Sequence, residues 1–429
     1  MRVNTTRARH HRLEPHLRHK LYQRTLATLI ATWAACAQAG DPLTLTVNQG
    51  TNSDTLSFSS LGDLFATFNH TDQLQTKLAW YDDRIDSTAV LNDAGILFFF
   101  TTTNGGKDVR MDIPSTSFER SYTGGRDKSL KKLKKDIENN LSAIQRVLAS
   151  DTPNSISAGS PSSLQTQLSN ALFEIGFGSQ ASQIAAPADA ATGTASSSSV
   201  NTAGLGLRFG RYSQGGNIVQ NVTLPISYKW ELDADDERDN VTVALPITAG
   251  QIETAKVFSV QGMVARGLPV SPAWSLTPAV AYGLTGSRDL YQASQQISVS
   301  LTSDYQIPLE HGRSIGIGNM VAYFTTLGLK VDGFELNPKI SNTILRNGAV
   351  FTNPLDTELV WGEHLSLEAS YIHTNYLGSA LYITHTDEFG LTVGTDKNAK
   401  GLRRYLRAGL TYLTARSTHG FSANVGYWF

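Results

Sequence analysis

Apolar and polar residues alternate along many segments in the C-terminal half of the chain. The clearest segment is 218–232, where Val222, Leu224, Ile226 and Tyr228 occupy every second position, with hydrophilic residues or proline between them. Because successive side chains of a β-strand point to opposite faces, this pattern predicts strands with one apolar and one polar face. Such strands are predicted at 203–212, 218–232, 241–249, 256–267, 274–285, 296–306, 315–329, 340–351, 357–362, 364–376, 380–394, 402–414 and 419–429.

These alternating strands favour an all-β fold whose C-terminal part is a transmembrane antiparallel β-barrel. The apolar faces carry Tyr or Trp near their ends, and the other faces are small and hydroxylic, as expected for lipid outside and water inside. Soluble all-β proteins also alternate apolar and polar residues, which is the less favoured interpretation. The segment 357–362 is the weakest, and bacterial single-chain barrels have even strand numbers. We therefore predict about 12 strands, with ten or fourteen as alternatives.

The last predicted strand carries a second pattern. Phe421, Ala423, Val425, Tyr427 and Phe429 lie on one apolar face of it. This face, with its terminal Phe, resembles the C-terminal insertion signal of Gram-negative outer-membrane β-barrel proteins. The resemblance implies a location in the outer membrane, contact with its lipids, and recognition by the barrel-assembly machinery through the C-terminal strand. The length and strand pattern of residues 203–429 also resemble autotransporter barrels, including solitary barrels that lack a large passenger.

The first 39 residues are typical of a cleaved secretory signal peptide. Residues 1–24 hold seven Lys or Arg and one acidic residue, and a short apolar run follows. Ala37 and Ala39 then match a cleavage site after Ala39. The long basic region fits an extended leader or a misplaced start codon equally well. Lipidation of Cys36 is a rival interpretation, but Trp33 stands where such sites usually carry Leu or another aliphatic residue.

Three regions are predicted between the leader and the barrel. Residues 40–125 have the pattern of a small β-rich domain. Residues 126–150 carry Leu and Ile at helical spacing and predict an amphipathic helix. Residues 151–202 are rich in Ser, Ala, Gly and Pro and predict a disordered linker. Within this linker, 163–177 holds enough Leu and Phe for a short helix that can enter the barrel.

The predicted amphipathic helix has a cluster of lysines near its start. Lys131, Lys132, Lys134 and Lys135 lie away from its apolar stripe. The helix macrodipole disfavours cations at this end, so contact with anionic lipid is one explanation for them. A solvated face on a helix that packs against the preceding domain is the other explanation, and it is favoured.

Composition narrows the possible partners. Subtracting the leader's seven basic residues and one acidic residue from totals of 36 and 37 leaves 29 basic and 36 acidic residues, a net charge of −7. An acidic balance argues against nucleic acid as the main partner. Without Cys36 the mature chain has no cysteine for a disulfide. Metal-binding motifs are also missing, so we expect neither a metal nor a cofactor.

Two groups of residues are candidates for chemistry inside the barrel. By the alternation, the charges of Lys229, Glu231, Glu368 and Arg407 point into the lumen. Charges there either pair across the lumen and close it or set an ion preference, and solvation of a polar interior is an equally weighted alternative.

A catalytic site is a weaker hypothesis. His364, Ser366 and Glu368 share the polar face of one predicted strand, and His419 lies in the last strand. Neighbours on one strand face are roughly 7 Å apart, which is too far for the hydrogen bonds of a Ser-His-acid triad. We therefore expect no enzymatic activity.

The sequence thus predicts an outer-membrane β-barrel with a structural or pore-forming transport role and a small N-terminal domain in the periplasm. The first alternative is a minimal autotransporter that displays residues 40–200 at the cell surface, although these residues lack the repeated β-helix units of the usual passenger. The second and least favoured alternative is an outer-membrane lipid hydrolase. No residue pattern identifies a transported solute.

Overall fold

A computed structural model describes most of the chain beyond the predicted leader. The described residues are 43–68, 70–93, 96–114, 118–178, 201–233, 236, 238–290, 292–331, 334–358, 364–395 and 405–428. The predicted cleavage site at Ala37 and Ala39, together with Cys36 and Phe429, lies outside them. No helix within these ranges is long and apolar enough to cross a membrane.

The N-terminal part of the structure is a six-stranded antiparallel sheet with two short helices. Alternate side chains of the first strand, Leu43, Leu45 and Val47, are fully buried and form one apolar face of the sheet. Helices α2 (Leu61–Phe68) and α3 (Thr71–Lys77) follow the second strand. The strands are β1 (Leu43–Gln49), β2 (Asn52–Phe58), β3 (Thr88–Asp93), β4 (Ile96–Thr103), β5 (Asp108–Ile113) and β6 (Phe118–Tyr122), in the order β2-β1-β3-β4-β5-β6.

A long helix, α4 (Arg126–Asp151), completes this domain. Its residues Leu130, Leu133, Ile144 and Leu148 are buried in the same apolar cluster as the sheet residues. The amphipathic stripe predicted at 126–150 is therefore the face by which the helix packs on its own domain. This is the favoured one of the two explanations for that helix.

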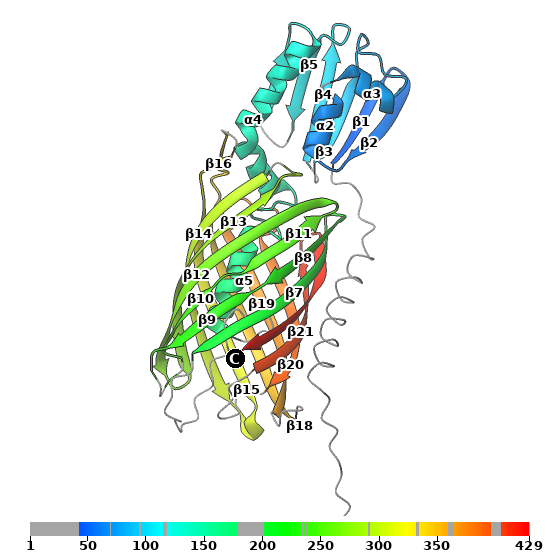
Figure 1. Ribbon diagram of the computed structural model, residues 1–429. Coiled ribbons are helices and arrows are strands. Elements are labelled where there is room, and N and C mark those ends of the chain that lie inside the picture. The colour runs from blue at the N-terminus through cyan, green and yellow to red at the C-terminus, as the bar shows by residue number, and fades with distance from the viewer. Residues whose placement is uncertain are drawn as a thin grey trace, which may run out of the picture. The chain divides into compact units, whose positions relative to one another are not determined.

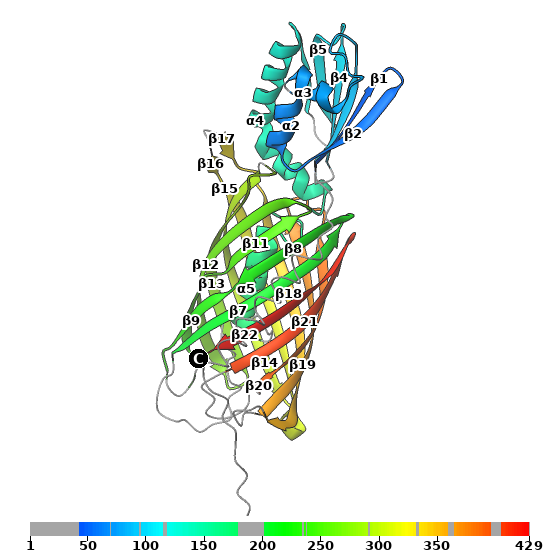
Figure 2. The same ribbon diagram turned by 45° about the vertical axis from the view of Figure 1, so that its right-hand side comes forward.

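The C-terminal part is a closed antiparallel barrel, drawn in green to red in Figures 1 and 2. Its last strand pairs with its first, which closes the sheet and leaves no free edge. The strands are β7 (Thr202–Gln214), β8 (Asn217–Leu224), β9 (Ile226–Glu231), β10 (Asn240–Ala244), β11 (Ile247–Ile252), β12 (Ala255–Ser271), β13 (Trp274–Ser287), β14 (Gln292–Pro308), β15 (Ser314–Leu327), β18 (Ser341–Glu358), β19 (His364–Gly378), β20 (His385–Thr395), β21 (Tyr405–Ala415) and β22 (Thr418–Trp428).

Prolines and one merged pair of segments set the strand count. Pro225 separates β8 from β9 and Pro246 separates β10 from β11, because proline has no N–H for the ladder. Each of these pairs is one interrupted strand, so the barrel has twelve strands. Nearly all of the predicted segment 340–351 and the first two residues of 357–362 belong to the single strand β18, whose register shifts between Leu355 and Glu358; residues 359–362 lie outside the described part. The thirteen predicted segments therefore become twelve strands, which confirms the predicted number.

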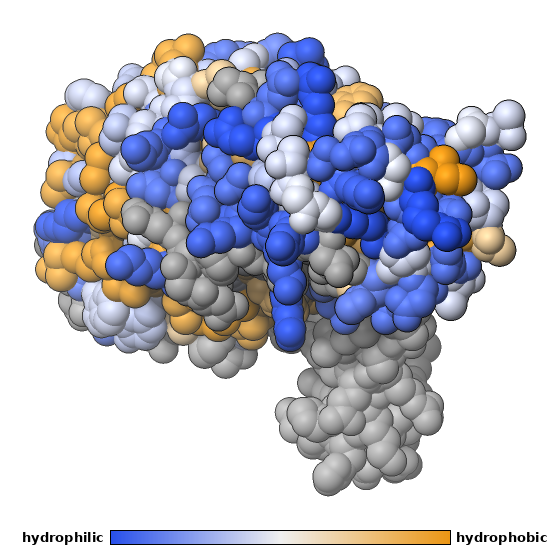
Figure 3. All heavy atoms as spheres, turned by 90° about the horizontal axis from the view of Figure 1, so that it is seen from above, coloured by the Kyte–Doolittle hydropathy of each residue, from blue (hydrophilic) through white to orange (hydrophobic). Residues whose placement is uncertain are grey.

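The barrel wall is apolar outside and polar inside. Phe258 and Leu391 on the outer face are 60% and 55% exposed, whereas inward Ser298 and Thr302 are 2% and 1% exposed. Figure 3 shows hydrophobic residues gathered along the flank of the wall. A large contiguous apolar surface of this kind suits lipid and not water, so the barrel is of the outer-membrane type.

The two ends of the barrel differ in what they hold. We call the end where β7 begins and β22 ends the proximal rim; a 3-10 turn, η1 (Glu310–Gly312), also lies there. We call the opposite end the distal rim. It holds the turns at 215–216, 253–254, 288–290, 379–384 and 416–417 and the hairpin of β16 (Leu329–Val331) and β17 (Phe334–Leu336).

A buried segment occupies the space inside the barrel. Residues 152–178, which we call the plug segment, contain helix α5 (Leu164–Phe177), and the helix contacts β12, β13, β14 and β15. The linker predicted at 151–202 is therefore wrong for residues 152–178. Small residues such as Ser, Ala and Gly predict disorder in solution, but inside a barrel they allow a chain to fit closely against the wall. The short helix predicted at 163–177 lies within this segment.

Candidate functional site: the occupied barrel lumen

Local sequence signals fix both ends of α5. The Ser163 hydroxyl accepts a hydrogen bond from the Thr166 N–H, which is the usual N-cap arrangement. At the other end Gly178 has φ 59°, a left-handed conformation that glycine adopts without strain. Because these caps satisfy backbone groups locally, the helix can be buried without unpaired ends.

Small residues of the wall make room for the bulky side chains of α5. Leu164, Leu168, Leu172, Phe173 and Phe177 are all at most 2% exposed. The wall opposite them carries glycines: a Cβ built on Gly283 would lie 2.8 Å from Leu164, and one on Gly318 would lie 2.4 Å from Phe177. A Cβ on Gly348 would similarly lie 3.1 Å from Phe173. Helix and wall are therefore sterically matched along the lumen.

Polar contacts fix the first turn of α5 near the distal rim. Gln165 Nε2 donates to Asn342 Oδ1 at 3.1 Å, and the hydroxyls of Thr166 and Tyr376 lie 3.2 Å apart. Gln167 Oε1 accepts from Ser259 at 3.0 Å and from Gln261 at 2.9 Å. These partners lie on β18, β19 and β12, so the start of the helix is bonded to several parts of the wall.

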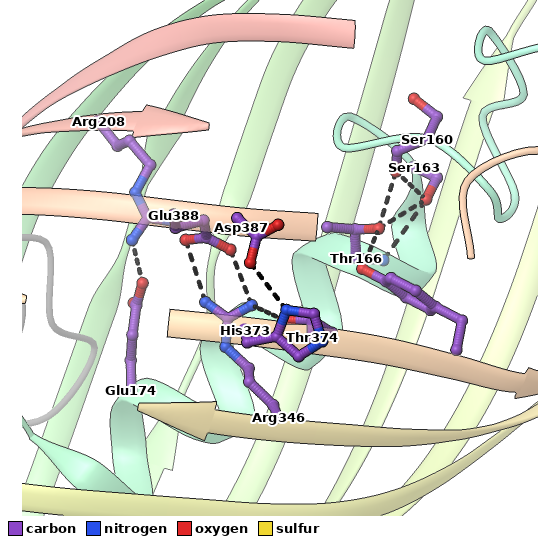
Figure 4. Close-up of polar contacts among 11 residues, drawn as sticks. Ser160, Ser163, Thr166, Glu174, Arg208, Arg346, His373, Thr374, Asp387 and Glu388 are labelled. Carbon is purple, nitrogen blue, oxygen red and sulfur yellow. Dashed lines mark hydrogen bonds and ion pairs between the residues drawn. The ribbon is translucent and has the colours of Figure 1, made fainter. Parts of the chain in front are cut away.

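One ion pair joins the second half of the helix to the wall, and a second pair lies within the wall beside it, as Figure 4 shows. Glu174 of α5 pairs with Arg208 of β7. Arg346 of β18 donates to both carboxylate oxygens of Glu388 on β20, at 2.9 and 3.2 Å, and to Thr374. The Arg346 guanidinium also lies 5.1 Å from the ring centroid of Phe173. The bidentate pair is thus covered by the plug, and it needs this geometry to offset its desolvation.

The residues before α5 fill the mouth of the barrel at the distal rim. From Thr152 to Ser163 every residue except Ser162 is buried. Gln296 of the wall donates to the Ser157 carbonyl at 2.7 Å, and the Tyr382 N–H donates to the Ala149 carbonyl at 2.8 Å. The chain therefore enters the lumen at the distal rim and runs toward the proximal rim.

A small cavity lies beside the helix in the described part of the lumen. A cavity of about 40 Å³ is lined by Glu174, Arg208, Tyr212 and Gln261, among others. Since one water needs about 10–15 Å³ of such volume, this cavity holds about three waters. The described residues contain no group of three or more His, Cys, Asp or Glu side chains that can hold a metal ion.

The four predicted lumenal charges lie on the inner side of the wall. Lys229 is 4% exposed, and its Nζ lies 3.9 Å from a carboxylate oxygen of Glu231. Arg407 and Glu368 are 0% and 1% exposed and form an ion pair, and Glu368 also accepts from Thr352 at 3.3 Å. These pairs join neighbouring positions of the wall and do not cross the lumen, so both roles predicted for these charges, closing the lumen and setting an ion preference, stay predictions.

Sequence reasoning missed two arginines that contact the plug and the glutamate that pairs with one of them. Arg208, Arg346 and Glu388 occupy inward positions of strands that were predicted correctly, so the alternation alone places them in the lumen. Glu174 had no comparable signal, because it lies in a segment interpreted as a linker. The ion pair between Arg208 and Glu174 could therefore not be predicted from the sequence.

The terminal strand has the predicted two faces. Phe421 and Val425 are 53% and 40% exposed on the outside, with Ala423 and Tyr427 on the same face. Trp428 points the other way and is fully buried. Recognition of this face by an assembly machinery stays a prediction.

The other candidates lie at the surface or in unrelated contacts. His364 and His419 are exposed at the barrel ends, whereas Ser366 and Glu368 are buried and Glu368 is held by Arg407. A hydrolase therefore gains no assembled triad from these residues. The lysines of α4 stay a predicted lipid contact: Lys131, Lys132 and Lys135 are exposed, and the side chain of Lys134 lies outside the described part.

No family model matches the sequence, and no curated protein sequence matches it. Among solved structures, the β domain of the Bordetella autotransporter BrkA covers 53% of this chain and 98% of its own at 15% identity, with a TM-score of 0.44. The translocator domain of the autotransporter NalP from Neisseria meningitidis covers 53% and 87% at 13% identity, TM-score 0.40. An outer membrane channel from Pseudomonas putida covers 54% and 94% at 9% identity, TM-score 0.36.

Proposed function

We propose that this chain is a self-plugged outer-membrane barrel that holds its own N-terminal domain, residues 43–151, at the cell surface. One observation carries this proposal. The plug segment runs along the lumen and leaves it at the distal rim, where the Ala149 carbonyl accepts from Tyr382. In this proposal the barrel anchors the domain in the membrane, and the domain reaches the cell surface through the barrel lumen. The plug segment is the part of the chain that remains in the lumen.

The orientation follows from how an even-stranded barrel enters a membrane. With twelve strands, the start of β7 and the end of β22 lie at the same rim. A barrel that inserts from the periplasm pushes hairpin turns through the bilayer and leaves those two ends on the side of entry. The proximal rim then faces the periplasm and the distal rim faces outward, so the domain before residue 152 is outside the cell.

The contacts inside the lumen support a barrel that is closed at rest. The apolar side of α5 packs against the inner wall, and the cavity of about 40 Å³ beside it in the described part of the chain is far smaller than a sugar-sized solute. The protein then acts as a display anchor and not as a permanently open pore. Conduction requires the plug segment to move.

A second candidate is favoured by the turns. Three distal turns, at Gly215–Gly216, Glu253–Thr254 and Arg416–Ser417, have only two residues, and short turns are typical of the periplasmic side. In this orientation residues 43–151 lie in the periplasm, and the barrel is a structural or transport barrel capped by a periplasmic domain.

Protease shaving of intact cells separates the two candidates. An epitope tag inserted after Gly50, in the exposed turn between β1 and β2, is lost on shaving if the domain is displayed. A matched tag after Pro272, in the turn between β12 and β13 at the proximal rim, is then protected until the outer membrane is permeabilised. The reverse result, with only the Pro272 tag lost, contradicts the proposed display function.

A further inference from the structure

Four aromatic side chains form a row on the outside of the barrel. Tyr371, Phe389, Tyr412 and Phe421 are directly opposite one another on β19, β20, β21 and β22. The ring centroids of Tyr371 and Phe389 are 5.2 Å apart and those of Tyr412 and Phe421 are 4.9 Å apart. Aromatic rows mark the boundary between the hydrocarbon and the head groups of a membrane. On this side of the barrel, the head-group level therefore begins one row closer to the distal rim.

The next row toward the distal rim is polar and carries histidines. His373, Asp387, Thr414 and His419 are opposite one another across the same four strands. The exposed side chain of His385 lies beyond this row on β20, at the distal rim.

Two arginines extend this surface. Arg416, in the turn between β21 and β22, is exposed, and its guanidinium lies 4.4 Å from the ring centroid of Tyr382. Arg211 is exposed on β7 directly opposite Phe421. A guanidinium stacked on a ring keeps its N–H groups at the edge of the plane, where they can contact an anion. We call His373, His385, Arg416, His419 and Arg211 together the distal cationic patch.

Neighbouring groups orient the histidine at one end of the patch. Asp387 Oδ1 lies 2.8 Å from His373 Nδ1 and accepts from the Tyr371 hydroxyl at 2.7 Å. The rings of His373 and His385 have centroids 6.3 Å apart. When its ring carries both protons, His373 donates one N–H to Asp387 and has the second for an anion. Asp387 is the acidic member of the row.

We propose that the distal cationic patch binds the phosphate groups of a bis-phosphorylated glycolipid of the outer leaflet, the lipid A class. This inference rests on the proposed function, since only an outward distal rim brings the patch to that leaflet. The patch stands at head-group level, its two arginines outnumber Asp387, and arginine binds phosphate oxygens by charge-assisted hydrogen bonds, to which histidine N–H groups can add.

The width of the patch favours a lipid with two phosphates. From β19 to β7 there are four strand spacings of about 4.8 Å, a span of about 19 Å. His373 and His385 lie at one end of this span, and His419 and Arg211 lie at the other. A phospholipid with a single phosphate fills only one end of it.

The test uses the purified full chain in detergent and counts bound lipid by native mass spectrometry. The probes are diphosphoryl lipid A, monophosphoryl lipid A and phosphatidylglycerol. We expect diphosphoryl lipid A to bind best, and the double variant His373→Ala/Arg416→Ala to weaken its binding roughly tenfold or more, as loss of charge-assisted hydrogen bonds requires. Arg288→Ala is the matched control: it removes an exposed distal arginine from the turn between β13 and β14, on the other side of the wall.

Three results overturn the proposal. The first is unchanged binding in the double variant, and the second is an equal loss in Arg288→Ala. In the third, phosphatidylglycerol binds as well as diphosphoryl lipid A, which shows general phosphate binding without preference for the outer-leaflet lipid. A heat-modifiable gel shift confirms that each variant still forms the barrel. Because binding in detergent does not depend on orientation, a failed shaving test and a failed lipid test remain distinguishable.

Discussion

Replacing Gly318, on the inner face of the barrel wall, by Ala should displace the plug segment from its position in the lumen. A methyl group at this position would lie 2.4 Å from the Phe177 ring, well inside the ordinary contact distance. The conflict involves the base of a buried ring and not the tip of a flexible chain, so the helix end has to shift. Overpacking of this kind costs about 1–3 kcal/mol, which raises the population of the unseated plug about 5-fold to 150-fold.

Single-channel recording in planar bilayers measures this population as the fraction of time that a barrel conducts. The wild-type protein should be closed for nearly all of the record, and Gly318→Ala should open it more often. Gly262→Ala is the matched control, because a Cβ there meets nothing within 4 Å. The control should record as the wild type does.

A second substitution at the same contact tests the reasoning further. Phe177→Ala removes a buried ring, which alone costs about 3–5 kcal/mol of plug seating. In the double variant Gly318→Ala/Phe177→Ala the new methyl enters the vacated space. The free-energy cost of seating the plug in this variant should therefore be about 1–3 kcal/mol smaller than the sum of the two single costs. If Gly318→Ala conducts no more than Gly262→Ala, or if the two substitutions are simply additive, Phe177 is not seated against Gly318 as described.

Two further predictions concern ionised groups that are buried. Arg407→Met leaves Glu368 without its ion-pair partner and should destabilise the barrel by about 3–5 kcal/mol. The double variant Arg407→Met/Glu368→Met should regain most of this stability. The temperature of the heat-modifiable gel shift measures the stability of both variants, and equal stability would contradict the pairing. In the N-terminal domain, burial raises the pKa of Asp93 to about 7, above the value of about 3.9 in an unfolded chain. The folded domain therefore loses stability as pH rises from about 4 to 7, by up to about 4 kcal/mol. Asp93→Asn should make the stability of the domain less dependent on pH. The urea midpoint, followed by Trp80 fluorescence, measures this; an equal fall of the midpoint between pH 4 and 7 in the wild type and in Asp93→Asn would contradict the prediction.

The barrel was predictable because its physical cause repeats in every strand. A wall between lipid and a polar interior forces alternation at period two, and that period can be read from any one strand without knowing its partners. Breaks at Pro225 and Pro246 are also visible, since proline cannot join a ladder. The merging of 340–351 with the following segment was not predictable, because Asn353-Pro354 resembles a turn when the partner strand is unknown.

The plug was only partly predictable, for an equally physical reason. Its composition predicts disorder because Ser, Ala and Gly bury little apolar surface in water. Inside the barrel the surface is already provided by the wall, so small residues become an advantage. The contact of Glu174 with Arg208 depends on how far the helix is inserted, and no local pattern in the sequence encodes that depth.

An ion pair between the plug and the wall contributes to the single position of the plug. The apolar side chains of α5 are matched to glycines of the wall, and hydrogen bonds hold its first turn to β12, β18 and β19. The Glu174–Arg208 pair adds a further constraint, because a shift of the helix leaves the buried Glu174 and the partly buried Arg208 unpaired. Buried pairs of this kind add little net stability compared with apolar residues, but they penalise every other register. We therefore attribute the closing of the lumen to the apolar side of the helix, and its exact seating to the glycine contacts, the hydrogen bonds of the first turn and the Glu174–Arg208 pair together.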